Sequence, residues 1–159
     1  AKRIENRLKK MGVQPLKKKY RNYFVLQEEE QQILTFNITA RINKDQPCKL
    51  ILVAHYDHLG LGDKHSREIN FPIVHNGADD NASGVSIALI LTEMLQKKCK
   101  DLPYGITIVF TSGHELGLYG ANFFVKENES LLKEKPYVLN FDMVIISGIL
   151  QNCQNQMPD

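Results

Sequence analysis

Three apolar segments constrain the fold of this chain more than any other feature of its sequence. They read "CKLILVAHYD" at residues 48–57, "YGITIVFTSG" at 104–113 and "YVLNFDMVII" at 137–146. An almost continuous apolar run of this length is typical of a strand that is buried on both faces of a sheet. Helix-like segments at 81–98 and 118–135 lie between them. Apolar strands that alternate with helices predict an α/β fold with a layered sheet.

The N-terminal part adds a helix and two further strands to this prediction. Ile4, Leu8 and Met11 follow helical spacing, and Gly12 favours the end of that helix. Residues 23–27 and 32–42 have strand character, and the acidic residues between them predict a turn. Because 159 residues suit a single domain, we expect residues 1–159 to form one.

Composition excludes several classes of protein. The chain is 43% apolar and 24% charged, as soluble globular proteins are. No apolar run reaches the roughly 18 residues of a membrane span, and no signal peptide is visible. Residues 1–21 hold nine basic residues and one acidic residue, yet no aromatic interleaving accompanies them, so we expect a solvated helix face rather than a nucleic-acid interface. The three cysteines form no CxxC pair and are expected to be free thiols.

Histidines and acids gather at four places, each after an expected strand or at the start of an expected helix. In an open α/β sheet the carboxyl ends of strands border the ligand crevice, so these side chains are expected to converge there. Mixed histidine and carboxylate ligands suit a hydrolytic zinc site. Each cluster alone is also explained by helix capping, turn formation or surface exposure. The clusters hold His55, Asp57 and His58; Asp79 and Asp80; His114 and Glu115; and Asp142.

Spacing within the first cluster indicates a supporting role for one carboxylate. Residues two apart in an extended segment point to the same side, so Asp57 can hold the far ring nitrogen of His55. A carboxylate with two oxygens can also bridge two metal ions, as in two-metal hydrolases.

Four motifs of the chain resemble motifs of the co-catalytic zinc aminopeptidases and occur in the same order as in that family. They are "AHYDHLG", "NGADDNASGV", "SGHELGLYGA" and "NFDMV". This family includes bacterial leucyl aminopeptidases, with glutaminyl cyclases and glutamate carboxypeptidase as relatives. The resemblance covers about residues 1–145. It implies a three-layer α/β sandwich whose mixed, mostly parallel central sheet is flanked by helices, here lacking its C-terminal part. It also implies removal of N-terminal residues from peptides.

Carried over residue by residue, the resemblance implies a zinc site. His55 and Asp142 match ligands of one zinc ion, Glu115 matches a ligand of the second, and Asp80 matches the bridging carboxylate. Asp57 matches the residue that orients the histidine, and Asp79 stands where the family accepts various residues. The family also implies a cis peptide bond between Asp80 and Asn81.

Two departures from the family pattern reduce the expected activity. His114 stands where the family has the glutamate that acts as general base, and a histidine there is expected to cost on the order of 10²–10⁴-fold. No histidine follows His114, so the last zinc ligand of the family is missing. The second site then keeps Asp80 and Glu115 only. The first keeps His55, Asp80 and Asp142 with one open position. One zinc ion or none is therefore expected.

The leading hypothesis is a zinc aminopeptidase of impaired activity that acts on peptides with a free N-terminus. A one-zinc amidohydrolase or cyclase-like protein and an inactive metal- or peptide-binding pseudopeptidase remain alternatives. His58, His65 and His75 do not match ligand positions. The strand that leads to Asp142 is expected near an exposed sheet edge, which favours a homodimer. Relatives imply a secreted or periplasmic location.

Overall fold

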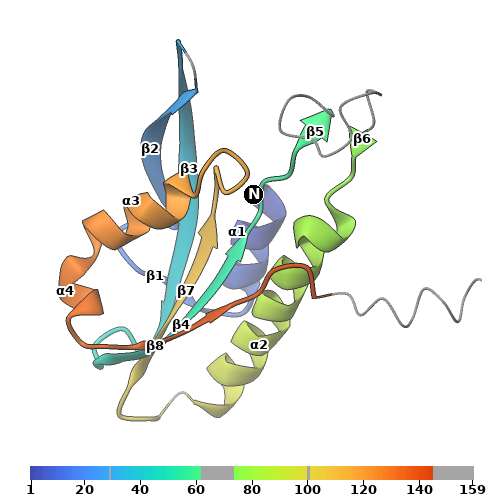
Figure 1. The fold of residues 1–159 in the computed structure, drawn as a ribbon. Coiled ribbons are helices and arrows are strands. Elements are labelled where there is room, and N and C mark those ends of the chain that lie inside the picture. Colours follow the sequence, from blue (N-terminus) through green and yellow to red (C-terminus); the bar gives the residue numbers. More distant parts are fainter. Residues whose placement is uncertain (29, 62–73, 100, 145–159) are drawn as a thin grey trace, which may run out of the picture.

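A six-stranded mixed sheet forms the centre of the molecule (Figure 1). The computed structural model describes residues 1–28, 30–61, 74–99 and 101–144. The strand order is β1-β3-β7-β4-β8, and β2 pairs with β3. The strands of this sheet are β1 (Gln14–Pro15), β2 (Arg21–Glu28), β3 (Gln31–Ile42), β4 (Cys48–His55), β7 (Gly105–Thr111) and β8 (Tyr137–Asn140). A separate ladder joins β5 (Gly60–Leu61) and β6 (Val74–His75).

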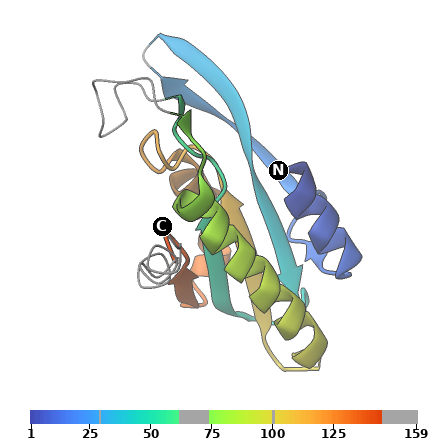
Figure 2. The same cartoon turned by 90° about the vertical axis from the view of Figure 1, so that its right-hand side faces the viewer.

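Helices cover both faces of the sheet, and this confirms the predicted three-layer arrangement (Figures 1 and 2). Beneath α1 and α2, a core contains Leu52 and Ala54 of β4. On the opposite face, Ile51 of the same strand packs in a cluster with Phe124 of α3. The helical elements are α1 (Lys2–Lys10), the irregular turn η1 (Ala78–Ser83), α2 (Gly84–Lys98), α3 (Tyr119–Glu127) and α4 (Glu129–Leu132).

The two central strands have the burial that their apolar sequences predict. All seven residues of β7 are buried, and β7 lies between β3 and β4. The N-terminal helix is also confirmed, because Ile4 and Leu8 of α1 are buried against the rest of the core. Among the described residues no helix has the length and apolar character needed to cross a membrane. Cys48 and Cys99 are free thiols, as expected, and Cys153 lies outside the described residues.

The sheet is mixed, as expected, but its parallel part is smaller than the family resemblance implies. In the described part of the sheet, β4 alone runs parallel to its neighbours, which are β7 and β8, whereas β1, β2 and β7 all pair antiparallel with β3. The link between β2 and β3 is a short hairpin, and a hairpin permits antiparallel pairing only.

The prediction that the last strand is buried was wrong. All four residues of β8 are exposed, and Tyr137 is 81% exposed. In the described part of the chain β8 pairs with β4 alone, so it is an edge strand with one uncovered side. Residues 145 and 146 of the predicted strand lie outside the described residues.

Candidate metal centre

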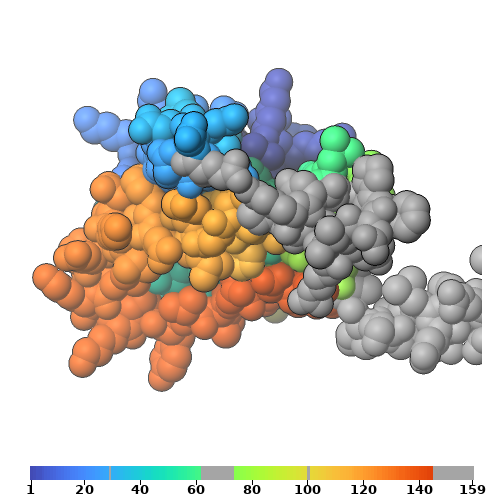
Figure 3. Space-filling model, turned by 45° about the horizontal axis from the view of Figure 1, so that its top comes forward, coloured from blue at the N-terminus to red at the C-terminus, as the bar shows by residue number. Residues whose placement is uncertain are grey.

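Strand register brings three of the predicted clusters to one edge of the sheet. His55, the last residue of β4, pairs with Thr111, the last residue of β7. On the other side of β4, Val53 pairs with Asn140, which ends β8. The residues that follow these parallel strands therefore meet, and η1 joins them from the start of α2. Figure 3 shows the molecule with this end turned forward, with the β2–β3 hairpin beside the segment after β7.

His55 is the centre of this cluster. Its side chain is 2% exposed, and its Nε2 lies 3.0 Å from Asp80 Oδ1 and 3.4 Å from Asp142 Oδ1. Despite this proximity, Nε2 makes no hydrogen bond. A buried nitrogen without a hydrogen bond is costly unless another partner satisfies it.

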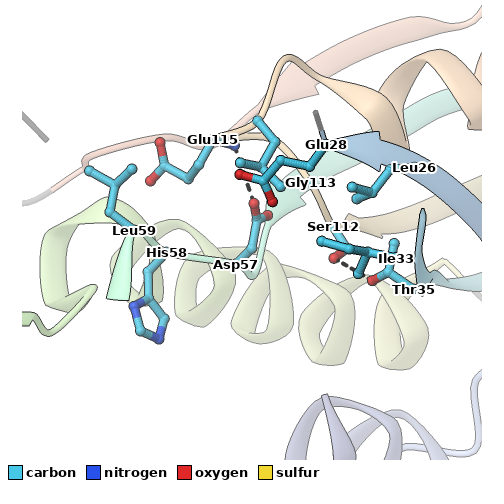
Figure 4. Close-up of a pocket in the computed structure, with 11 residues that line it drawn as sticks. Leu26, Glu28, Ile33, Thr35, Asp57, His58, Leu59, Ser112, Gly113 and Glu115 are labelled. Atoms are coloured by element: carbon cyan, nitrogen blue, oxygen red, sulfur yellow. Dashed lines mark hydrogen bonds between the residues drawn. The ribbon is translucent and has the colours of Figure 1, made fainter. Parts of the chain in front are cut away.

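Asp57 lies at the other nitrogen of the same ring. His55 Nδ1 is 3.2 Å from the Asp57 backbone carbonyl and 3.6 Å from its carboxylate, so the backbone makes the hydrogen bond and the carboxylate a longer ion pair. The same carboxylate accepts a hydrogen bond from the backbone N–H of Glu115 at 3.2 Å (Figure 4). Asp57 thus connects the residues that follow β4 and β7.

The acidic surroundings shift three pKa values at the site. Burial lowers the pKa of His55, but the adjacent Asp57 and the charges of Asp142 and Asp80 outweigh it and raise the pKa from 6.5 to about 9. Burial raises the pKa of Asp57, but His55 and the Glu115 N–H outweigh it, so this pKa is lowered. Burial, followed by the charge of Asp80, raises the pKa of Glu115. The site therefore concentrates negative charge around one imidazole.

His114 completes the cluster in an unexpected position. Its ring stacks on that of His55, with centroids 3.9 Å apart and planes inclined by 8°. Its Nε2 lies 3.7 Å from Asp142 Oδ2. Two overlapping sets of potential ligands result, and in each set the ligand atoms lie within 4.8 Å of one another. The sets are His55, Asp80 and Glu115, and His55, His114 and Asp142.

These distances fit a small cation. Two ligand atoms that bind zinc at 2.0–2.1 Å with a tetrahedral angle lie about 3.3 Å apart. The distances from His55 Nε2 to Asp80 and Asp142 lie on either side of that value. A cation would also satisfy the buried nitrogen of His55. The residues therefore fit a zinc ion.

The adjacent aspartates have different surroundings, as the sequence analysis expects. Asp80 faces His55, whereas Asp79 accepts hydrogen bonds from Ser83 Oγ through its backbone carbonyl at 2.6 Å and its carboxylate at 3.3 Å. The peptide bond between Asp80 and Asn81 is cis, as the resemblance implies. Before this turn, Gly77 has a φ of 68°, and an added Cβ would lie 2.9 Å from His58 Cβ.

Asn81 connects the segments of the cluster, and the sequence analysis missed this role. Its side chain is 2% exposed. Its Nδ2 donates to the backbone carbonyl of Phe141 at 2.8 Å and lies 3.4 Å from that of His55. Its Oδ1 accepts from the backbone N–H groups of Gly84 and Met143. The only sequence signal for it is an amide directly after the acidic pair.

The other histidines do not join the cluster. Neither His58 nor His75 belongs to a potential ligand set in the part of the chain that the structure describes. His65 lies outside the described residues.

A cavity of about 280 Å³ lies beside the cluster (Figure 4). Asp57 and Glu115 line it where it meets the cluster, and the β2–β3 hairpin supplies an apolar wall that contains Leu26 and Ile33. The sequence analysis missed this contribution, because nothing in the hairpin sequence indicates which of its faces meets the loop after β7. The remaining lining residues are Glu28, Thr35, His58, Leu59, Ser112, Gly113 and Leu116.

Comparisons with known proteins agree with this geometry. The chain is 33% identical over 106 residues to the alkaline phosphatase isozyme conversion protein of Escherichia coli (strain K12). The aligned region covers 65% of this chain and 30% of that protein. A zinc-dependent exopeptidase from Parabacteroides distasonis has a similar fold, with a TM-score of 0.71, 22% identity, and coverage of 90% of this chain and 52% of that one. Tannerella forsythia glutaminyl cyclase gives a TM-score of 0.56 and 28% identity over 69% of this chain and 36% of that one.

This chain thus spans about half the length of the exopeptidase and less of the other two proteins. A family model, described as Peptidase family M28, matches residues 37–158. The match begins within β3 and contains all four clusters of histidine and acidic residues together with the whole of β4, β7 and β8. The chain belongs to Peptidase family M28.

Proposed function

We propose that this chain carries the zinc site of an aminopeptidase, which removes the N-terminal residue of a peptide. The observation that supports it most directly is the buried Nε2 of His55, which has no hydrogen bond and lies beside Asp80 and Asp142. Family membership and the fold of the zinc-dependent exopeptidase support zinc as the metal.

His55, Asp80 and Asp142 would hold one zinc ion, and Asp80 with Glu115 would contribute ligands to a second. Bound zinc supplies Lewis acidity, which activates water as a nucleophile and polarises a carbonyl group. Asp57 keeps the His55 ring in place through Nδ1, so that Nε2 faces the ligands.

The sequence-based role of His114 is that of the general base. In that role its Nε2 accepts a proton from the attacking water and returns it to the leaving amine. An imidazole differs from a glutamate in shape and reach, so turnover is expected to be weak, on the order of 10²–10⁴-fold below an enzyme with glutamate at this position.

The cavity beside Glu115 is proposed to hold a side chain of the substrate. Its volume of about 280 Å³ exceeds that of an aliphatic side chain, and Leu26 and Ile33 offer an apolar wall. A peptide with a free N-terminus and an aliphatic side chain is therefore the proposed substrate. A secreted or periplasmic location remains a prediction from the relatives.

A cyclase-like activity is the second candidate, favoured by the 28% identity to Tannerella forsythia glutaminyl cyclase. An inactive metal-binding protein is the third, and the weak base favours it. Zinc content and turnover distinguish the three. Bound zinc with hydrolysis of leucyl-4-nitroanilide supports the peptidase, and bound zinc with cyclisation of a glutaminyl peptide supports the cyclase. Bound zinc with neither activity leaves the binding protein, and a chain that binds no zinc contradicts all three. His55→Ala is the control that should remove both metal and activity.

A further inference from the structure

We propose that His114 is itself a ligand of the metal ion, together with His55 and Asp142. This inference rests on the zinc site proposed above but changes the role of one residue in it. A nitrogen whose lone pair binds a metal cannot also accept a proton, so the ligand role excludes the general-base role of His114.

The distances around Asp142 support the ligand role. Asp142 lies between the two imidazoles, with Oδ1 3.4 Å from His55 Nε2 and Oδ2 3.7 Å from His114 Nε2. Both values are close to the roughly 3.3 Å that separates neighbouring ligands of a tetrahedral zinc ion. A general base needs a different place, one water molecule away from the ion rather than at ligand distance.

The buried nitrogen of His55 also supports the ligand role. His55 is 2% exposed, and its Nε2 lies 3.0 Å from Asp80 Oδ1 but makes no hydrogen bond. The ring of His114 lies directly against this imidazole. The described structure thus places a second imidazole beside a buried nitrogen that lacks a hydrogen bond.

The chemical preference of zinc supports the ligand role as well. Without His114, the two ligand sets found among the described residues offer one imidazole and three carboxylates. Imidazole suits zinc, whereas sites made mainly of carboxylates and water suit magnesium, calcium and manganese. A second imidazole therefore shifts the ligand set toward zinc.

The parallel stack itself must open for both rings to bind one ion. Each imidazole binds a metal in its own ring plane, and two stacked planes inclined by 8° do not meet at a common point near the two nitrogens. His55 is held from both sides, by burial and by the contacts of Nδ1 with Asp57. His114 is 30% exposed, so its ring has room to turn about its side-chain bonds. We therefore expect His114 to move and His55 to stay.

The test compares His114→Ala with His75→Ala, a histidine outside both ligand sets. Zinc affinity is measured by competition with a chromophoric chelator, and zinc X-ray absorption counts the imidazoles at the metal. We expect His114→Ala to weaken zinc binding by about 100-fold or more, and the imidazole count to fall from two to one. His75→Ala should change affinity by less than about 3-fold.

The base role predicts a different result. His114→Ala would then bind zinc as tightly as the unsubstituted chain, with one imidazole in both, and this would overturn the inference. If the unsubstituted chain binds no zinc, both this inference and the proposed function fail. Thermal unfolding in the presence of EDTA checks that His114→Ala folds. If it does not fold, the zinc affinity of His114→Asn and the imidazole count of the unsubstituted chain decide between the ligand role and the base role.

Discussion

The ring of His114 lies flat against the ring of His55, with centroids 3.9 Å apart and planes inclined by 8°. One imidazole is fixed from behind by Asp57, and the other is partly exposed. A turn of the His114 ring about its side-chain bonds would bring a second imidazole nitrogen toward the carboxylate of Asp142.

Asp80 and Asp79 form a matched pair for testing the ligand set. Asp80 Oδ1 lies 3.0 Å from His55 Nε2, whereas Asp79 contacts Ser83. We expect Asp80→Asn to weaken zinc binding by at least about 10–100-fold and Asp79→Asn to change it by less than about 3-fold. Chelator competition measures both. Equal losses in the two variants would mean that the acidic turn acts through its total charge.

Ile33 tests whether the cavity holds a substrate side chain. Ile33→Trp fills part of the cavity, so we expect zinc-loaded protein to bind leucine hydroxamate about 10-fold more weakly while alanine hydroxamate is little affected. Isothermal titration measures both. Leu34→Trp, on the neighbouring residue that is 68% exposed, is the control. If both ligands are affected equally by Ile33→Trp, the cavity does not select the side chain.

Leu8 tests the attachment of α1, which lies before the residues that the family model matches. Its side chain is fully buried in the main core. Leu8→Ala is expected to lower the free energy of unfolding by about 3 kcal/mol, since a cavity remains. Urea denaturation measures this, with Leu34→Ala as the exposed control. A loss below about 1 kcal/mol would show that α1 contributes little to stability.

Glu5 gives a pH dependence that is separate from the metal site. Its carboxylate accepts hydrogen bonds from Lys9 at 2.7 Å and Arg21 at 2.8 Å, and the Lys9 contact is the main cause of its lowered pKa. Because the folded-state pKa lies below 4.5, the stabilisation is present above pH 4.5 and is lost as the pH falls through the lowered pKa.

Glu5→Gln should therefore lower the free energy of unfolding by about 1 kcal/mol at pH 7. The difference between the variant and the unsubstituted chain should shrink in acid. Thermal unfolding between pH 3 and 7 measures it. Glu30→Gln, at an exposed turn residue, is the control. A difference that persists unchanged at pH 3 would count against an ionic origin.

The exposed side of β8 is expected to pair with a second copy of the chain. Tyr137, Val138 and Leu139 are all exposed on this edge strand. Small-angle scattering should show a dimer or larger species, and Val138→Lys should shift it toward monomer, because a lysine opposes edge pairing. Leu34→Lys is the control on the distant hairpin. A monodisperse monomer for the unsubstituted chain would contradict this prediction.

The sequence predicted the elements well because their patterns are local. The apolar runs identified β4 and β7, and the spacing of Ile4 and Leu8 identified α1. The position of β8 near a sheet edge was expected and is confirmed in the described sheet. Its apolar composition nevertheless predicted burial, which was wrong because burial depends on the neighbours of a strand and not on its own residues.

The convergence of the clusters was predictable, but their detailed contacts were not. Parallel strands end at the same edge, so His55 and Asp142 were expected to meet. The stack of His114 on His55 depends on the path of the loop after β7, and no spacing rule specifies that path. The ligand roles themselves remain predictions.

The four backbone contacts of Asn81 have a consequence for how a metal ion would be received. One neutral amide joins the end of β4, the start of α2 and the residues on both sides of Asp142. The main chain beside three acidic or imidazole groups is thus fixed during folding, before any cation arrives. Only the His114 ring and the partly exposed carboxylates still have to be ordered on binding. Removal of the metal should therefore leave the secondary structure intact, while a bound ion should stabilise the existing fold by an amount set by its affinity and its free concentration.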